Sequence, residues 1–211
     1  GWGGTAPGAL NGGTWEGAGG VQDDAWYVRQ QKLAKSILDR QRELGIHPVL
    51  PGFSGMVPVN FTQKTGVPTD ANGGRWAGGF QRPRIIDPTY EGFAEIAADY
   101  YACLKEVMGE SQYYSMDPFH EGGAISSGKY TEAYRAIYDA MEATKPGSQW
   151  VIQQWQWDGN QRKSISAVPA GRLIVLDLAP AGRPALDHYT GYAPPHAAPC
   201  AIPTSAGRPG P

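Results

Sequence analysis

Three stretches of the chain repeat apolar residues at the three- and four-residue spacing of an amphipathic helix. They span residues 24–44, 87–109 and 129–144, and we predict a helix over each. The apolar face is formed by Trp26, Leu33, Ile37 and Leu44 in the first, by Phe93, Ile96, Ala97, Tyr100 and Leu104 in the second, and by Tyr130, Ala133 or Tyr134, Ile137 and Met141 in the third.

Residues typical of helix ends flank these stretches. Asp23 or Asp24 can cap the first helix, which Gly45 ends. Asp87 is the N-cap candidate of the second helix, with a proline at the next position, and Gly109 closes that helix. We therefore expect the first two helices to begin and end at these residues.

Four shorter stretches between the helices are rich in apolar and aromatic residues and predict strands. They are "IHPVL" at 46–50, "YYSM" at 113–116, "QWVIQQWQW" at 149–157 and "GRLIVLDL" at 171–178. The alternation of helices and strands predicts an α/β fold with parallel strands and outer helices. Because a closed barrel needs eight strands and this chain supplies about four to five, we expect a partial or truncated (β/α)8 TIM-type barrel.

The remaining segments differ in composition. Residues 1–22 are rich in glycine and predict a loop, and residues 52–86 predict a long loop after the first strand. "CAIP" at 200–203 fits one more short strand, and residues 204–211 predict a disordered end. We therefore expect one barrel domain over residues 1–203.

The composition excludes several classes of function. The 18 Lys and Arg residues stand against 20 Asp and Glu, so no basic surplus is present to bind nucleic acid. No apolar run approaches the roughly 20 residues of a membrane span. The four histidines lack the spacing of metal ligands, and we predict no metal and no cofactor. Seven Trp and eleven Tyr suit a sugar-binding cleft and an ordinary core alike.

The two cysteines, Cys103 and Cys200, form no CxxC pair. Cys103 falls on the apolar side of the second predicted helix, so we expect no disulfide. Residues 60–62 form an N-glycosylation triplet, but such triplets arise often by chance, and we predict no glycan there.

Each predicted strand ends in a cluster of polar or aromatic residues, marked by Ser54, Glu121, Trp155 and Asp177. The carboxyl ends of the strands form the active-site face of a β/α barrel. In "SMDPFHEGG" at 115–123 the strand runs directly into two carboxylates and a histidine. If the strand continues through this stretch, Asp117 and Glu121 lie on the same side of it.

Five blocks of sequence point to a known family. They are "GWGG" at 1–4, "LGIHPVLPGFSGMVP" at 44–58, "YYSMDPFHE" at 113–121, "VIQQWQW" at 151–157 and "AVPAGRLIVLDL" at 167–178. In this order they resemble glycoside hydrolase family 89, the α-N-acetylglucosaminidases. The resemblance implies a retaining hydrolase that releases terminal α-linked N-acetylglucosamine from glycans. It also favours a secreted, periplasmic or lysosome-like compartment.

The resemblance implies that Glu121 is the general acid/base of this reaction. The chain departs from the family at His120, where the family has an Asn that holds the 2-substituent of the sugar. The family's nucleophile lies on a later strand, beyond residues 200–203. We therefore do not nominate Asp177 as the nucleophile, and we expect the 211 residues alone to be inactive on α-N-acetylglucosaminides.

Six residues are candidates for binding the sugar, and each has a structural alternative. They are His120, Trp2, Gly3, Ser54, Trp155 and Asp117. Trp2 and Gly3 would otherwise belong to a flexible end, Ser54 to a tight turn and Trp155 to the core. The structural alternative for Asp117 and His120 is a role as polar partners of other protein groups. For Glu121 the alternative is a solvated loop carboxylate.

Two other functions fit parts of the sequence. A related barrel glycosidase with a different sugar specificity is favoured by His120. A non-catalytic glycan-binding remnant is favoured by the lack of a second carboxylate at a family catalytic position.

Overall fold

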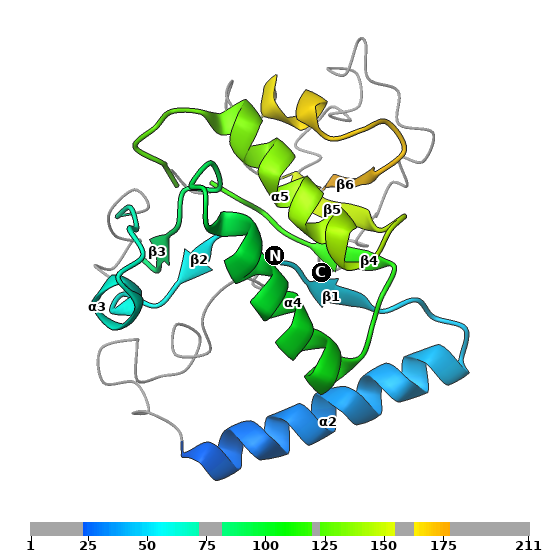
Figure 1. Cartoon of the computed structure of the whole chain (residues 1–211). Coiled ribbons are helices and arrows are strands. Elements are labelled where there is room, and N and C mark those ends of the chain that lie inside the picture. Colours follow the sequence, from blue (N-terminus) through cyan, green and yellow to red (C-terminus); the bar gives the residue numbers. More distant parts are fainter. Residues whose placement is uncertain (1–22, 72–81, 120–122, 155–162, 178–211) are drawn as a thin grey trace, which may run out of the picture.

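A parallel sheet forms the centre of the fold (Figure 1). The structure is a computed structural model that describes residues 23–71, 82–119, 123–154 and 163–177. Its strands are β1 (Val49–Pro51), β4 (Tyr113–Ser115), β5 (Gln149–Gln154) and β6 (Leu173–Asp177), in the order β1-β4-β5-β6. All three pairings are parallel, which confirms the predicted α/β fold with parallel strands.

One row of side chains crosses the sheet and forms the middle of the core. The register aligns Leu50, Tyr114, Trp150 and Leu173, whose exposed fractions are 3% or less. The Trp150 ring stacks on Tyr134 with 5.3 Å between ring centroids. The row therefore faces the helix layer.

Two helices cover this face of the sheet, α4 (Phe93–Met108) and α5 (Tyr130–Thr144) (Figure 1). The predicted apolar face of α5 is confirmed, because Ala133, Tyr134, Ile137 and Met141 are all buried. Tyr101 of α4 packs edge-on against Tyr114 of β4, with 5.4 Å between ring centroids. A short 3-10 helix, η2 (Ile165–Ala167), precedes β6.

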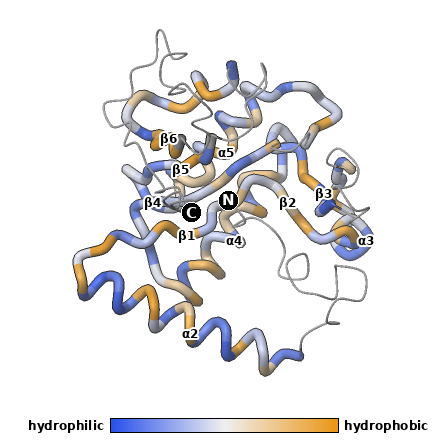
Figure 2. The backbone as a smooth tube through the Cα atoms, turned by 180° about the vertical axis from the view of Figure 1, so that it is seen from behind, coloured by the Kyte–Doolittle hydropathy of each residue, from blue (hydrophilic) through white to orange (hydrophobic). Residues whose placement is uncertain are grey.

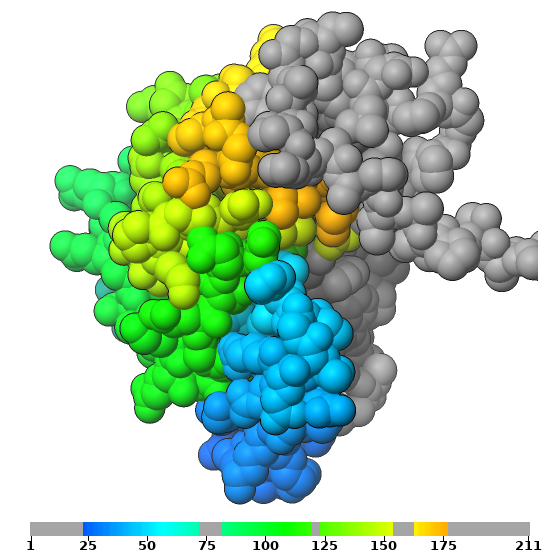
Figure 3. All heavy atoms as spheres, turned by 90° about the vertical axis from the view of Figure 1, so that its right-hand side faces the viewer, coloured from blue at the N-terminus to red at the C-terminus, as the bar shows by residue number. Residues whose placement is uncertain are grey.

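The first helix, α2 (Asp24–Glu43), lies at one end of the molecule, beside the residues that lead into β1 (Figure 3). Its predicted cap is confirmed, since Asp23 Oδ1 accepts a hydrogen bond from Trp26 N at 2.7 Å. Apolar residues recur along it (Figure 2), yet none of its residues is buried. Leu33 is 54% exposed and Ile37 50%. The predicted apolar stripe is therefore present in sequence but does not face the core.

Contacts between α2 and the rest of the molecule come from other residues. Leu38 packs against the core, and Arg42 donates through Nη2 to the carbonyl oxygens of Met108 and Glu110 at 3.1 and 3.3 Å. These bonds join α2 to the end of α4.

Two predictions about α4 are wrong. Asp87 does not cap it, because Asp87 Oδ1 accepts bonds from Thr89 N and Thr89 Oγ1 within a turn at 2.9 and 2.8 Å. The helix begins after Gly92, and it ends at Gly109 as predicted. Cys103 is exposed on α4, not on its buried side.

The predicted loop between β1 and α4 contains its own small elements. They are β2 (Met56–Val57), α3 (Phe61–Thr65) and β3 (Arg84–Ile85), and β2 pairs with β3 in antiparallel fashion. We call the segment between β1 and α4 the insertion. Its residues Ile85 and Ile86 are 1% and 0% exposed, so the insertion packs against the core through these side chains. The predictions for residues 1–22, for a strand at 200–203 and for the end at 204–211 lie outside the described residues.

Candidate active site

The carboxyl ends of the parallel strands meet at one edge of the sheet, and Asp117 lies there, two residues beyond β4. Its Oδ1 accepts a hydrogen bond from Gln153 N of β5 at 2.7 Å. Just before it, Met116 O accepts a bond from Trp150 Nε1 at 2.8 Å. These two bonds hold the end of β4 against β5. They give Asp117 the structural role of a polar partner, and its contact with a sugar stays a prediction.

The chain turns sharply after Asp117. Phe119 has a φ of 63°, in the left-handed region that bulky side chains rarely adopt. Its ring is 6% exposed and packs edge-on against Tyr130 of α5, with 5.2 Å between ring centroids. β4 ends at Ser115, so the strand does not continue through this stretch, which was the condition for Asp117 and Glu121 to lie on one side of it. Pro118, which has no N–H for a ladder bond, and the turn at Phe119 prevent its continuation.

Ser54 lies three residues after β1 and is buried, with 1% of its surface exposed. The next residue, Gly55, has a φ of 95°, and its carbonyl oxygen accepts a bond from Ile86 N at 2.8 Å. On the other side of Ser54, Phe53 N donates to the hydroxyl of Tyr101 at 3.1 Å. Burial raises the pKa of that hydroxyl well above its usual range. Ser54 thus sits in a tightly held turn, and its contact with a sugar hydroxyl stays a prediction.

A carboxylate that the sequence did not single out joins the insertion to the loop after β4. Asp70 Oδ2 accepts a bond from Ser126 N at 2.9 Å, and Asp70 Oδ1 accepts one from Ser126 Oγ at 2.8 Å. The two residues are 56 positions apart, and no local motif marks the pair.

The other predicted site residues cannot be compared with the structure. Glu121, His120, Trp2, Gly3 and Trp155 lie outside the described residues. The backbone of Asp177 is described, as the last residue of β6 in register with Gln154.

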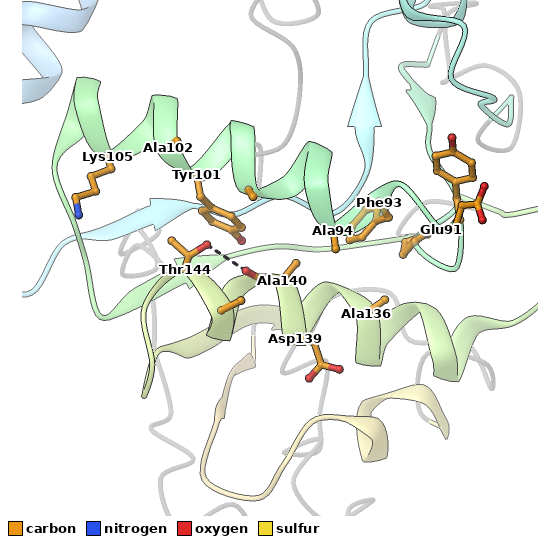
Figure 4. Close-up of a pocket in the computed structure, with 14 residues that line it drawn as sticks. Glu91, Phe93, Ala94, Tyr101, Ala102, Lys105, Ala136, Asp139, Ala140 and Thr144 are labelled. Carbon is orange, nitrogen blue, oxygen red and sulfur yellow. Dashed lines mark hydrogen bonds between the residues drawn. The ribbon is translucent and has the colours of Figure 1, made fainter.

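A groove of about 700 Å³ lies elsewhere, between α4 and α5 on the helix layer (Figure 4). Small residues line both of its sides, among them Ala94 and Ala102 of α4 and Ala136 and Ala140 of α5. Charged groups there are few, and they include Glu91, Lys105 and Asp139. Because the groove opens between helices and not at the strand ends, it is not the predicted sugar site.

Within the described ranges, no group of three or more His, Cys, Asp or Glu side chains is arranged to hold a metal ion. In the same part of the chain, no helix is both long enough and apolar enough to cross a membrane.

The four-stranded parallel sheet, its outer helices and the polar residues beyond the strand ends define part of an enzyme-type β/α barrel. Comparison with known proteins gives the family. Residues 9–208 match the alpha-N-acetylglucosaminidase (NAGLU) tim-barrel domain, and the chain belongs to this family. The expected partial TIM-type barrel and the resemblance to family 89 are thereby confirmed.

Relatives of known activity support the same assignment. The chain is 30% identical over 184 residues to human alpha-N-acetylglucosaminidase, covering 81% of this chain and 24% of that protein. A family 89 glycoside hydrolase from Clostridium perfringens, in complex with 2-acetamido-1,2-dideoxynojirmycin, superposes with a TM-score of 0.70 at 33% identity. That alignment covers 79% of this chain and 19% of the bacterial chain.

A second structure of the bacterial protein contains a substrate. It is a variant with two glutamates replaced by glutamine, in complex with its substrate GlcNAc-alpha-1,4-galactose, and it matches with a TM-score of 0.69 at 33% identity. The present chain spans about a fifth to a quarter of the length of these relatives.

Proposed function

We propose that this chain forms part of a retaining glycoside hydrolase that releases terminal α-linked N-acetylglucosamine from glycans, with Glu121 as the general acid/base. The observation that carries the proposal is the family match over residues 9–208. The human relative is named for this activity, and the bacterial relative has GlcNAc-alpha-1,4-galactose as its substrate.

In the proposed reaction, protonated Glu121 gives its proton to the glycosidic oxygen while a second carboxylate attacks the anomeric carbon. The bond to the leaving group breaks, and the sugar becomes covalently attached to the second carboxylate. Glu121, now ionised, takes a proton from water as the water oxygen attacks the same carbon. The second carboxylate leaves, and the sugar is released with its original anomeric configuration. Neither step needs a metal or another cofactor.

The surroundings of the strand end favour a catalytic group after Phe119. Met116 and Asp117 are held to β5 by hydrogen bonds of 2.8 and 2.7 Å, and Phe119 is buried against α5. A group attached to so rigid a support keeps its orientation while the reaction proceeds. We propose that Glu121 uses this support.

The contacts with the sugar are part of the same proposal. His120 and Trp155 follow β4 and β5 in sequence, and Ser54 follows β1. Their positions after the strands favour contact with a ligand on the active-site face. Trp2 and Gly3 are assigned to the pocket on the resemblance of the first block of sequence.

The test is an assay of the protein as its gene encodes it, with aryl α- and β-N-acetylglucosaminides and an aryl α-glucoside. We expect turnover of the α-N-acetylglucosaminide alone, and the first product detected by NMR is expected to be the α-anomer. Preference for another sugar would indicate the related glycosidase, and an initial β-anomer would contradict the retaining mechanism. Binding without turnover would indicate a glycan-binding protein.

A further inference from the structure

We propose that α2 is a docking surface for a second copy of this chain, and that the two α2 helices pair with each other in antiparallel fashion. The surface is the apolar stripe of α2, which consists of Trp26, Leu33, Ile37 and Leu44. α2 is the outermost helix at the lower edge of Figure 1. The proposed reaction makes no use of this helix, so the inference is independent of the proposed function.

The apolar stripe lies on the side of α2 that faces away from the rest of the described molecule. Its members follow one another at spacings of seven, four and seven residues, which return to one face of a helix with about 3.6 residues per turn. Leu38 and Arg42, which hold α2 in place, lie on the other face. Leu33, Ile37 and Leu44 are 54%, 50% and 58% exposed. Large apolar side chains that line up on an outer face are typical of an interaction site.

The order of residues along the stripe favours the same helix of a second copy as its partner. In the heptad pattern of a coiled coil, the seam of α2 consists of Trp26, Gln30, Leu33, Ile37, Arg40 and Leu44. The character of these residues is symmetric about the point between Leu33 and Ile37. An antiparallel copy therefore sets Leu33 of one helix against Ile37 of the other, and the two apolar ends of the seam meet as well. Between them, the Gln30 side-chain oxygen can accept a hydrogen bond from the Arg40 guanidinium of the other copy.

Charges beside the seam support the antiparallel pairing. Arg29 and Glu43 are exposed on the same flank of the seam. An antiparallel copy brings Arg29 of one helix beside Glu43 of the other, and the two-fold symmetry makes this contact twice. Glu43 is held at this flank, because it accepts a hydrogen bond from Arg40 Nη1 at 2.9 Å. In a parallel pair Arg29 would instead meet Ala34, which carries no charge.

The size of the contact sets the expected affinity. α2 has 20 residues, which gives a helix about 30 Å long. Only this helix from each copy takes part, so the interface lies at the small end of those that support specific association. We therefore expect a dimer with a Kd of about 1–100 μM.

The test is sedimentation equilibrium of the protein as its gene encodes it, at concentrations on both sides of this Kd. Ile37→Glu puts an uncompensated charge into the centre of the interface, and we expect the Kd to rise by about a hundredfold or more. The matched control is Val28→Glu, since Val28 is 46% exposed and lies outside the seam on the opposite side of α2. The control should leave the Kd unchanged. Equal effects of the two variants would overturn the inference.

Charge reversal tests the antiparallel direction. Arg29→Glu alone and Glu43→Arg alone each bring like charges together twice, and each should raise the Kd about tenfold. When the two variants are mixed, both contacts again join opposite charges, and the mixed dimer should be about as tight as the wild-type dimer. A mixture that associates no better than its separate components would overturn the antiparallel pairing.

The same experiments detect other partners of the stripe. If the wild-type protein stays monomeric and Ile37→Glu lowers its melting temperature, another part of the gene product covers the stripe. If it stays monomeric and the melting temperature does not change, the stripe has no partner in the protein. Either result would overturn the inference.

Discussion

The two edges of the parallel sheet are built differently. At the amino edge, the residue or two before each strand tie that strand to its neighbour. The Ser111 hydroxyl donates to Pro48 O, and the Gln112 amide donates to Gly147 O. Arg172 Nη1 donates to the same Gly147 carbonyl at 2.7 Å. Together these three bonds link all four strands.

At the carboxyl edge, the segments that follow β1 and β4 hold residues of the candidate site, and one of them contains a residue other than glycine with a positive φ. Phe119 has a positive φ, which costs of order 1–3 kcal/mol for a residue other than glycine. Glycines with a positive φ lie at both edges, as Gly55 after β1 and Gly147 before β5 show. The Asp70–Ser126 contact at the carboxyl edge joins two segments far apart in sequence. In β/α barrels stability resides largely at the amino edge and chemistry at the carboxyl edge. Here we expect the residues at the amino edge to serve stability alone, and those at the carboxyl edge to serve both stability and the reaction.

The largest effect on stability is expected from a substitution of Gly55, which tests how tightly the carboxyl edge is packed. A Cβ on Gly55 would lie 2.5 Å from Ile86 O, and the backbone has a φ of 95°. Gly55→Ala should lower the free energy of unfolding by about 3 kcal/mol or more. Denaturant unfolding of the 211-residue chain measures it.

Gly66→Ala is the matched control for this variant. Gly66 also has a positive φ, of 77°, but a Cβ there would meet no atom within 4 Å. It should cost about 1 kcal/mol, from backbone strain alone. Equal costs for the two variants would show that the contact of Gly55 with the insertion contributes nothing.

A smaller effect is expected from the amino edge. Ser111→Ala removes the hydroxyl that donates to Pro48 O and accepts from Tyr113 N at 3.1 Å. The loss leaves buried backbone groups without these bonds, and it should cost about 1–3 kcal/mol of stability. Catalytic activity of the gene-encoded protein should stay at the wild-type level below the unfolding temperature.

The control for Ser111→Ala is Ser36→Ala on the exposed surface of α2, where the hydroxyl donates to Lys32 O at 3.0 Å. It should change stability by less than about 0.5 kcal/mol. A Ser111→Ala variant that keeps its stability but loses activity would reverse the proposed division between the two edges.

The smallest effect on stability is expected from a substitution of Glu110, an exposed residue that precedes β4 at the amino edge. Hydrogen bonds from Lys105 and then Lys145 lower the pKa of Glu110 below its usual value. A lowered pKa in the folded state stabilises the protein above the pKa of the unfolded state, about 4.3, and this stabilisation is lost as the pH falls through the folded value. Glu110→Gln should therefore lower the melting temperature slightly at pH 7.

The difference between wild type and Glu110→Gln should disappear in acid and shrink at high salt, which screens exposed charges. In about 1 M salt, exposed charges separated by more than about 3 Å are largely screened from each other. A difference in melting temperature between the two proteins that persists under these conditions would contradict a purely electrostatic effect.

The sequence predicts the fold well where a helix packs on the sheet and less well where it lies at the edge. The apolar spacing of α5 corresponds to its buried face, because the sheet covers that side. Similar spacing on α2 leaves Leu33 and Ile37 half exposed, since the helix touches the rest of the molecule mainly through Leu38 and Arg42. Periodicity identifies a helix, but the position of the helix in the fold decides what the apolar face meets.

The candidate site is only partly predictable, for physical reasons. Asp117 at the end of β4 follows from the strand pattern, because parallel strands place their carboxyl ends together. Asp70 does not follow, because its partner is 56 residues away and its own segment has no periodic pattern. The positive φ of Phe119 is not predictable from the sequence, because the residue is not a glycine. The turn is stabilised by contacts of Phe119 with aromatic residues of α5.

The central claim is that Glu121 supplies the proton to the leaving group. The most direct measurement compares Glu121→Gln with wild type on a GlcNAc-α-galactoside and on a GlcNAc glycoside with an activated dinitrophenyl leaving group. We predict that kcat/KM falls by about 10²–10⁴ on the first substrate and far less on the second, which needs little protonation. Exposed Glu106→Gln on α4 serves as the control and should leave both values unchanged. Equal losses on the two substrates for Glu121→Gln would contradict the account, because they would mean that Glu121 binds the sugar without protonating the leaving group.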